Sequence, residues 1–192
     1  MWEHVYQSAA RGYQQDVHFK FLHRVLPTNG FIASRFRGRG FAAANPNCSF
    51  CPPDHPETQF HAMQSCPLAR DVLIPFMPTF RALTANPRFR CYNLLTNYFS
   101  PPVTPAIRDI TTTLYQIILH TIWTNRNSRK FYNIHPHINQ SIATIRRDFT
   151  NCIRDRLRHT GLAKFRQLYC THPDILQTDD NGKIYFTIKP SD

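Results

Sequence analysis

The chain has 192 residues and a mass of 22.5 kDa, with 42% hydrophobic and 13% aromatic residues. A chain of this size and composition can bury a substantial core as one domain, which excludes a wholly disordered protein. No run of about 18 apolar residues occurs, and the first residues lack the basic start and apolar stretch of a secretory signal. We therefore expect an intracellular protein in a reducing compartment, with no membrane partner.

The formal net charge of +11 is high for this length, and 18 of the 23 basic residues are arginine. The planar guanidinium group of arginine matches phosphate better than the ammonium group of lysine does. The charge is unevenly distributed, since residues 48–66 and 171–192 each carry −2 while residues 135–170 carry +5. This pattern favours a polyanion, above all nucleic acid, as the partner. A membrane surface, an acidic protein, or basic charge that serves only solubility are the alternatives.

Most of the chain is predicted to be helical, because its apolar residues recur at intervals of three or four positions. In chain order, the predicted helices cover residues 3–25, 28–37, 67–83, 88–99, 104–132, 139–161 and 162–169. Pro27 ends the first helix, while Pro75 and Pro78 interrupt the third. Thr104 and Pro105 begin the longest helix, because threonine is a good N-cap and proline suits the first helical turn.

Two helix starts have alternatives. Thr28 or Asn29 caps the second helix, and Asn139 or Ser141 opens the sixth. Residues 180–188, DNGKIYFTI, are the one stretch predicted as β-structure. Their Asn-Gly pair suits the turn of a hairpin.

The helix over residues 141–159 separates its charge from its apolar side. Its apolar side chains gather on one side, whereas Arg147, Arg154 and Arg158 project together from a distant face. Three neighbouring cations repel one another, and a phosphate backbone would relieve that repulsion. We therefore predict nucleic-acid contact on this face. A merely solvated face is the alternative, and two aspartates on the same helix are available as ion-pair partners.

Two further basic clusters are predicted to contact nucleic acid. The first lies in and before SRFRGRGF, where glycine permits close backbone approach and the phenylalanine rings can stack on unpaired bases. The second lies at the end of the long helix, next to Trp123. The residues of both clusters are Lys20, Arg24, Arg35, Arg37, Arg39, Arg126, Arg129 and Lys130. For the first cluster, the alternative is a helix end with exposed charges and two core phenylalanines.

Three of the six cysteines fall within 19 residues, in CSFCPPDHPETQFHAMQSC. The spacing is Cys48, two residues, Cys51, nine residues, His61, four residues and Cys66. Three thiolates and one imidazole are the ligand set of a closed tetrahedral Zn²⁺ site, which leaves no position for an activated water. We therefore predict a structural zinc ion held by these four residues. His55 is a rival to His61, but it lies between an aspartate and a proline in a loop.

The two downstream ligands cannot both lie on a regular α-helix. In an ideal helix, residues five positions apart, such as His61 and Cys66, point about 140° away from each other. The helix that begins near Thr58 is therefore expected to unwind by Ser65, which Pro67 favours.

The expected fold is mainly α: an irregular helical domain stapled by one structural zinc site, with a short C-terminal β-hairpin. The metal would join the helix over residues 28–37 to the helix after Pro67 and contribute on the order of 10 kcal/mol or more. The regions expected along the chain are basic N-terminal helices in 1–47, the CCHC zinc-binding motif in 48–66, a basic helical region in 67–170 and an acidic tail in 171–192.

The segments FKFLHRVLPTNGFIASR, CSFC and PETQFHAMQSCPLARDV, over about residues 17–76, resemble a known domain. It is the zinc-binding domain that follows the reverse transcriptase in non-LTR (LINE-type) retrotransposons. The matching residues, in order, are Leu26-Pro27-Thr28, Cys48, Cys51, Glu57-Thr58, His61 and Cys66. IWTNRNSRKFYN, with Trp123, Arg126, Asn127 and Phe131, is similar to a looser signature found downstream in that family.

The resemblance implies a C-terminal module that helps a reverse transcriptase hold its RNA template or its target DNA during target-primed reverse transcription. The reverse transcriptase domain of the same element is then a further partner, and the module acts in the cytoplasm and the nucleus. The resemblance does not imply an enzyme, because the chain lacks a Y-x-D-D polymerase motif. Asp179 and Asp180 lie in QTDDNG, where a turn explains them.

A degenerate restriction-like endonuclease is one alternative function. Pro173-Asp174 and Lys189 fit its Pro-Asp, spacer, acid-x-Lys layout, but Thr187 stands where the metal-binding carboxylate belongs. Without that second acid, a Mg²⁺ site loses its charge.

A protein-interaction module is the other alternative, with a basic surface that meets acidic partners. The acidic tail, residues 171–192, would then be able to cover the arginines within the same chain. The salt dependence of binding distinguishes this function from nucleic-acid binding, because phosphate binding weakens steeply as the salt concentration rises.

Overall fold

The structure, a computed structural model, describes residues 3–36, 45–90, 92–93 and 99–189. Their helices are α1 (Glu3–Gln7), α2 (Gly12–Leu22), α3 (Asn29–Arg35), the π-helix η1 (His61–Ser65), α4 (Pro67–Leu73), the 3₁₀-helix η2 (Ile74–Phe76), α5 (Met77–Leu83), α7 (Pro105–Tyr132), α8 (Ile138–Thr160) and α9 (Leu162–Tyr169). The strands are β1 (Leu176–Thr178) and β2 (Ile184–Phe186). The predicted mainly helical fold with a C-terminal hairpin is confirmed. Within the described residues, no helix is long and apolar enough to cross a membrane.

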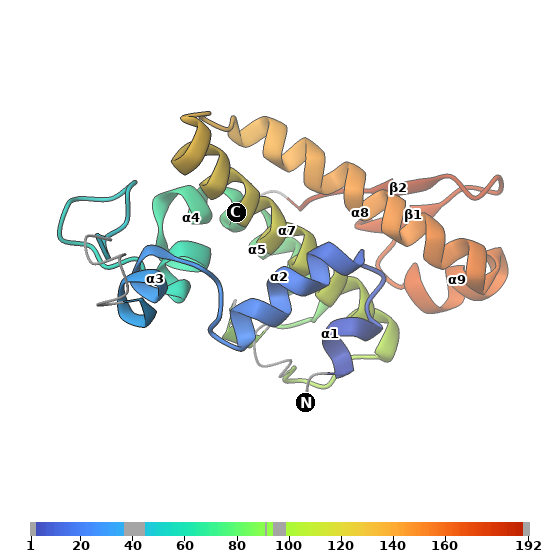
Figure 1. Cartoon of the computed structure of the whole chain (residues 1–192). Helices are drawn as coiled ribbons and strands as arrows, with labels where there is room; N and C mark the ends of the chain where they lie inside the picture. Colours follow the sequence, from blue (N-terminus) through green and yellow to red (C-terminus); the bar gives the residue numbers. More distant parts are fainter. Residues whose placement is uncertain (1–2, 37–44, 91, 94–98, 190–192) are drawn as a thin grey trace.

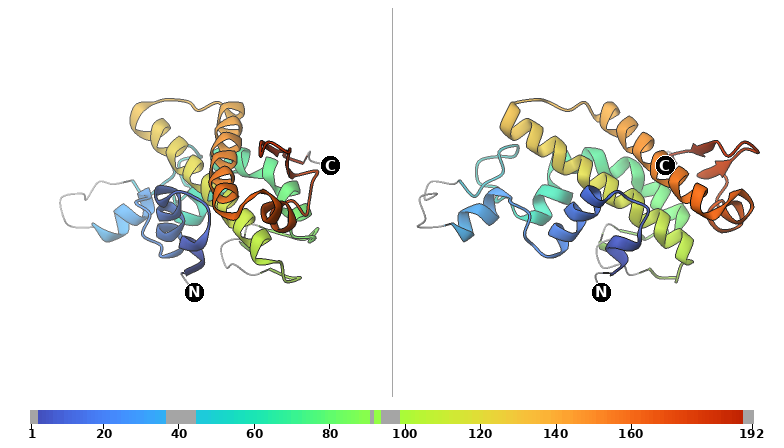
Figure 2. Two further views of the ribbon diagram at one scale, coloured as in Figure 1. Left: turned by 90° about the vertical axis from the view of Figure 1, so that its right-hand side faces the viewer. Right: turned by 45° about the vertical axis from the view of Figure 1, so that its right-hand side comes forward.

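Helix α7 is the central element of the fold. It is 28 residues long and is packed by α2, α4, α8 and α9, so that side chains around much of its circumference are buried (Figure 1). Helix α3 lies toward one end of the molecule, whereas α9 and the hairpin lie at the other (Figure 2). Because α7 contacts elements at both ends of the molecule, it fixes the two ends relative to each other.

The predicted boundaries of α7 are confirmed by its caps. The Thr104 hydroxyl accepts a hydrogen bond from the backbone N–H of Ile107 at 3.2 Å, and Pro105 occupies the first turn. At the other end, Asn133 adopts a left-handed conformation with φ 52°, which stops the helix.

The single helix predicted for residues 3–25 is wrong. The chain leaves the helical path after Gln7 and resumes it at Gly12. Between them, the backbone N–H of Ala9 donates to the carboxylate of Asp109 at 2.9 Å and to the hydroxyl of Thr113 at 3.0 Å. Hydrogen bonds to α7 thus replace those of a continuous helix, and no local sequence pattern reports them.

Residues 88–90, the start of the helix predicted over residues 88–99, are not helical, and residues 91 and 94–98 of that prediction lie outside the described residues. Two other departures from the predicted helices are small. Pro75 lies in η2 and Pro78 in the first turn of α5, so the chain tightens into a 3₁₀ turn between α4 and α5 where an interruption was predicted. Helix α8 begins at Ile138, with His137 as a cap that makes no side-chain hydrogen bond, one residue before the earlier of the two predicted starts.

The C-terminal hairpin is antiparallel and packs on α8. Leu176 faces Phe186 across the two strands, and Gly182 supplies the positive φ, 75°, that the connecting turn requires. The ring of Phe186 lies 4.4 Å from that of Phe149 on α8, centroid to centroid. This contact fixes the hairpin against the charged helix.

Replacing Thr104 by alanine tests the role of the α7 cap. Because the orphan N–H of the first turn loses its acceptor, we expect Thr104→Ala to lower the free energy of unfolding by about 1 kcal/mol. Thr124→Ala, the same change at an exposed position within α7, is the control and should have little effect. Urea denaturation measures both variants, and equal stability of the two would contradict the assigned cap.

Candidate metal centre

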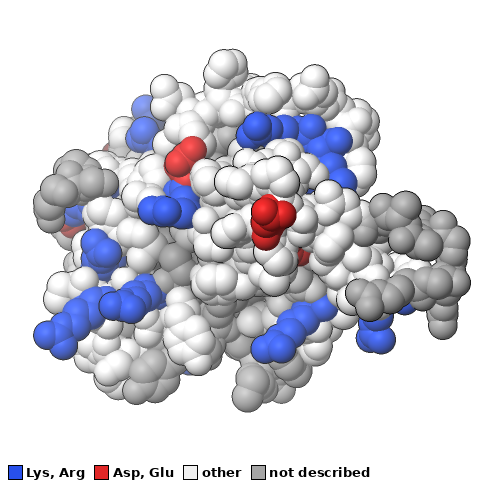
Figure 3. All heavy atoms as spheres, turned by 90° about the vertical axis from the view of Figure 1, so that its left-hand side faces the viewer, with Lys and Arg blue, Asp and Glu red and all other residues white. Residues whose placement is uncertain are grey.

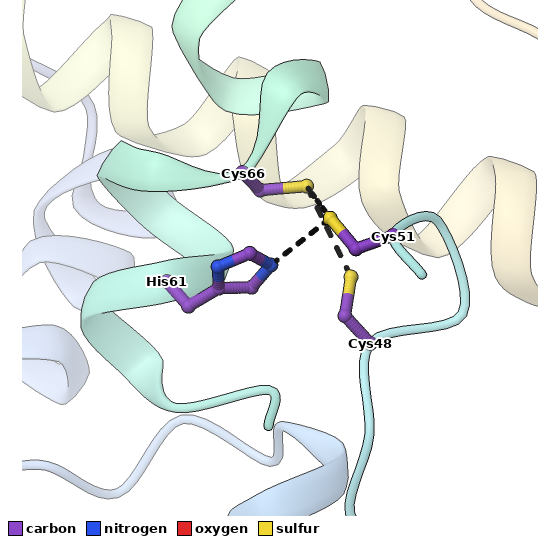
Figure 4. A group of neighbouring side chains, drawn as sticks. All are labelled: Cys48, Cys51, His61 and Cys66. Atoms are coloured by element: carbon purple, nitrogen blue, oxygen red, sulfur yellow. Dashed lines mark hydrogen bonds between the residues drawn. The ribbon is translucent and has the colours of Figure 1, made fainter. Parts of the chain in front are cut away.

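The first two predicted ligands lie on the ligand loop, residues 45–60, which precedes η1. The two sides of the loop are tied together by the backbone N–H of Cys48, which donates to the carbonyl of His55 at 2.7 Å, and by an isolated bridge between Asn47 and Pro56. The loop closes on itself around the C-x-x-C pair, so Cys48 and Cys51 are held on one tight turn (Figure 4). Local chain geometry therefore presents two sulfurs to the same side.

The other two ligands are brought together by a π-turn. The backbone N–H of Cys66 donates to the carbonyl of His61 at 2.8 Å, five residues back, and Cys66 then leaves the helical conformation with φ −59° and ψ 137°. A turn widened to five residues places the first and last side chains on the same side, which a regular α-helix does not. Contrary to the prediction, the helix does not unwind by Ser65; it widens into a π-helix through Ser65 and ends at Cys66, and this widening brings the two ligands together.

The ligand atoms of Cys48, Cys51, His61 and Cys66 all lie within 4.8 Å of one another. The sulfur of Cys51 is 3.4 Å from Nε2 of His61 and 3.9 Å from the sulfur of Cys66, which is 4.0 Å from the sulfur of Cys48. Zinc at its usual bond lengths, with tetrahedral angles, would set these separations at about 3.6 Å for sulfur to nitrogen and about 3.8 Å for sulfur to sulfur. The spacing is far too long for disulfides, and the group can hold a metal ion.

The surroundings of the ligands suit a bound cation. Burial raises the pKa of Cys48 and, together with the charge of Cys48, raises the pKa of Cys66 to about 12. Burial also lowers the pKa of His61, which favours the neutral form of its imidazole. The hydroxyl of Ser65 lies 3.4 Å from Nδ1 of His61 and can accept a hydrogen bond from an Nδ1–H group. In that tautomer, the lone pair of Nε2 faces the sulfurs. A divalent metal would replace the thiol protons and offset the cost of burying thiolates.

His55, the rival to His61, is exposed and is not one of the four converging residues. Its ring stands 4.7 Å from the ring of His61, centroid to centroid, and its carbonyl group holds the backbone of Cys48. The structure thus favours His61 as the ligand and gives His55 a supporting position.

A buried ion pair attaches the ligand loop to α7. Glu57 is fully buried and Arg126 is 3% exposed; Nη2 and Nε of Arg126 donate to the two carboxylate oxygens at 2.6 and 3.1 Å. The same carboxylate accepts the backbone N–H of Asn29 at 2.6 Å, at the first residue of α3. The Glu57 carbonyl lies so close to Gly30 that a Cβ there would approach its oxygen to 2.8 Å. One glutamate therefore joins the loop, α3 and α7.

Arg126 requires a correction as a predicted nucleic-acid contact, because its guanidinium is enclosed by Glu57 and cannot reach a phosphate. Its neighbours serve the same attachment. The Arg129 guanidinium lies over the ring of Phe50 in the ligand loop, 4.8 Å from the centroid, and the Lys130 ammonium donates to the side-chain oxygen of Asn29. Burial lowers the pKa of Lys130. The cluster at the end of α7 thus holds both the ligand loop and the start of α3.

The spacing of Arg126 along its helix indicates that it is buried, although its charge suggests an exposed side chain. Arg126 lies four residues after Ile122, which is itself four residues after Ile118, so it continues the apolar stripe of α7. An arginine on a buried stripe calls for a buried acid. Glu57 is that acid, and only the fold shows that the two meet.

The remaining predicted contacts differ in exposure. Arg24 and Arg35 are exposed, and Lys20 is half exposed in an ion pair with Asp16 at 2.7 Å. Arg37 and Arg39 lie outside the described residues. At the end of the molecule that carries α3, basic side chains form several separate groups with few acidic ones among them (Figure 3).

The three arginines predicted to face outward on α8 do so. Arg147 and Arg158 are 68% and 71% exposed, with ion pairs to Asp148 at 3.2 Å and Asp155 at 3.0 Å. Arg154 is exposed and donates to the side chain of Asn151 at 2.8 Å. Exposed pairs of this kind are weak, so these guanidinium groups can exchange a carboxylate for a phosphate at little cost.

The residues of the nuclease alternative form an ion pair, in which the ammonium group of Lys189 meets the carboxylate of Asp174. Among the residues that the structure describes, three or more side chains of His, Cys, Asp and Glu converge to hold a metal only at the Cys₃His group. Comparisons with models of known protein families, with curated proteins and with solved structures gave no match.

Loss of one ligand tests the metal centre. We expect the purified chain to carry one zinc ion, and Cys66→Ser to lose it and to unfold at a much lower temperature, because the metal contributes on the order of 10 kcal/mol or more. Cys170→Ser removes a half-buried thiol that lies outside the group and should keep the metal. Elemental analysis and thermal unfolding are the measurements; a metal-free wild-type chain of full stability would refute the site.

Breaking the Glu57–Arg126 pair tests the attachment of the loop. We expect Arg126→Met to cost about 3–5 kcal/mol, because it leaves a buried carboxylate without its cation. The control is Arg158→Met, which removes one partner of an exposed ion pair and should change stability by about 1 kcal/mol or less. Denaturant unfolding with zinc present measures both, and a similar small loss in the two variants would count against a buried pair.

Proposed function

We propose that this chain is a metal-stabilised nucleic-acid-binding module of a non-LTR retrotransposon reverse transcriptase protein. In this role it holds RNA template or target DNA during target-primed reverse transcription, with Zn²⁺ as the structural ion. The observation that carries the proposal is the convergence of Cys48, Cys51, His61 and Cys66 within 4.8 Å. These are the four residues that the resemblance assigns as ligands.

A second observation links the two stretches that the resemblance selects. Thr28 caps α3 by accepting the backbone N–H of Phe31 at 3.3 Å, while Glu57 accepts the N–H of Asn29 and binds Arg126. Three residues from the matching motifs therefore meet at the start of α3. They are Thr28 of the Leu-Pro-Thr turn, Glu57 of the Glu-Thr dipeptide and Arg126 of the downstream signature. Contact between stretches that lie 69 residues apart supports a shared domain architecture over a chance match of letters.

Charge supports nucleic acid as the partner. The net charge is +11, and arginines extend into solvent from α8 and near the end of α3. Such a surface attracts a phosphate backbone by releasing its counterions. All four metal positions are filled by protein, so the proposed role of the metal is to close the ligand loop onto the start of α4 and not to carry out a reaction.

Nucleic-acid binding is tested by fluorescence anisotropy with single-stranded RNA, structured RNA and duplex DNA across a salt series. We expect affinity to fall steeply as salt rises, by roughly 0.7 to 0.9 log units per log unit of salt for each phosphate neutralised. Arg147→Glu should weaken binding, whereas Lys164→Glu reverses an exposed charge on α9 and is the control.

Two results would refute the proposal. The first is a wild-type chain, with zinc bound, that binds none of these probes at low salt. The second is binding that does not respond to salt, because phosphate contacts cannot behave in that way. If acidic proteins bind while the nucleic acids do not, the protein-interaction module replaces this function.

A further inference from the structure

A basic groove lies between α8 and strand β2. Strand β2 and the part of α8 beside it lie away from the end of the molecule that carries α3 (Figures 1 and 2). Its volume is about 420 Å³. The polar side chains that line it on α8 are Arg146, Arg147, Thr150, Asn151 and Arg154, and β2 contributes Tyr185. Among the described residues that line the groove, none is acidic. It is a concave site with three guanidinium groups along one wall.

The wall on α8 is regular. Arg147 and Arg154 are seven residues apart, so they project from the same face two turns apart, about 10 Å along the axis. Thr150 and Asn151 fill the turn between them with a hydroxyl and an amide. Successive donors along a helix can follow a phosphate chain, and arginine offers them in pairs.

The opposite wall is the open edge of β2. The backbone of Lys183 and Thr187 bonds to the β1 side, through Asp179 and Ile175 at 3.1 and 2.9 Å. Alternation along the strand turns the backbone groups of Ile184 and Phe186 the other way, toward the groove, where Nη2 of Arg146 donates to the carbonyl of Phe186 at 3.2 Å. This bond fixes the distance between the two walls.

An aromatic ring completes the site. Tyr185 is 40% exposed, although both of its neighbours on β2 are buried. Its hydroxyl donates to the carboxylate of Asp179 at 3.1 Å, and the ammonium group of Lys183 lies 5.2 Å from its ring centroid. These contacts restrain the ring of Tyr185, which is one of the residues that line the groove. A fixed aromatic ring next to guanidinium groups is the combination that binds single-stranded nucleic acid.

We propose that the groove between α8 and β2 binds single-stranded nucleic acid, with the phosphates on Arg147 and Arg154 and a base stacked on Tyr185. The inference rests on the proposed function and gives it a location. A duplex is excluded from the stacking contact, because its bases are already stacked on one another. The arginines alone would accept any polyanion; the exposed tyrosine selects an unpaired strand.

The test uses the full chain with zinc bound and labelled oligouridine RNA, oligothymidine DNA and a duplex, each of about ten nucleotides or base pairs. We expect Tyr185→Ala to weaken single-strand binding about 5- to 150-fold, which is the usual value of one stacked base. Tyr185→Phe keeps the ring and should keep the affinity. Tyr6→Ala, the same truncation at another exposed tyrosine, is the control and should bind as the wild type does.

The charged wall is tested by the double variant Arg147→Gln/Arg154→Gln. We expect its salt slope for single strands to be shallower by about 1.4, since each lost phosphate contact removes about 0.7. Arg88→Gln/Arg90→Gln removes the same charge from two exposed arginines that do not line the groove, and should leave the slope unchanged. Photo-crosslinking of thiouridine RNA to the wild type provides a readout that does not depend on any variant and should map to α8 and β2.

The outcomes separate the two proposals. If the wild type binds no nucleic acid, the proposed function and the groove fail together. If it binds, but the groove variants match their controls and the crosslinks map elsewhere, the groove alone is overturned. Equal binding of the duplex, or equally strong competition by a polyglutamate peptide, would also overturn it.

Discussion

The buried ion pair between Glu57 and Arg126 is the interaction on which the arrangement of the metal-binding end depends. Removing both charges from water is costly, and the structure offsets that cost by satisfying the carboxylate with the guanidinium group and the N–H of Asn29. Because the glutamate lies on the ligand loop, the arginine on α7 and the asparagine at the start of α3, one network fixes three elements. The cysteines and the histidine then need only local geometry to converge.

A bound metal and the ion pair would stabilise different parts of the metal-binding end. The metal ligands all lie between residues 48 and 66, so a bound ion would close a short stretch of chain onto itself and onto the start of α4. It would not by itself reach α3 or α7, and the expected staple between α3 and α4 is therefore indirect. Glu57 connects the ligand loop to α3 and α7, and the ring of Phe50 beneath Arg129 adds a second contact between the loop and α7.

Helix α7 links the metal-binding end to the basic groove at the other end. Its 28 residues span about 42 Å, and α8 packs along it before turning into α9 and the hairpin. A bound metal would therefore support the groove only indirectly, through the ligand loop, the Glu57–Arg126 pair and α7. Basic regions at both ends of the molecule, held apart by one long helix, would suit the extended nucleic-acid strand that we propose as the ligand.

The sequence alone determined the features that depend on neighbours in the chain. The spacing of Cys48, Cys51, His61 and Cys66, the cap at Thr104 and the turn before β2 each act over a few residues, so their chemistry can be read from the letters. Tertiary structure decided what depends on distant partners. It broke the first helix through Asp109, buried Arg126 against Glu57 and brought Tyr185 and the arginines of α8 to the lining of one groove. The physical reason is that a charge or an N–H group has the same local signature whether it meets water or a partner a hundred residues away.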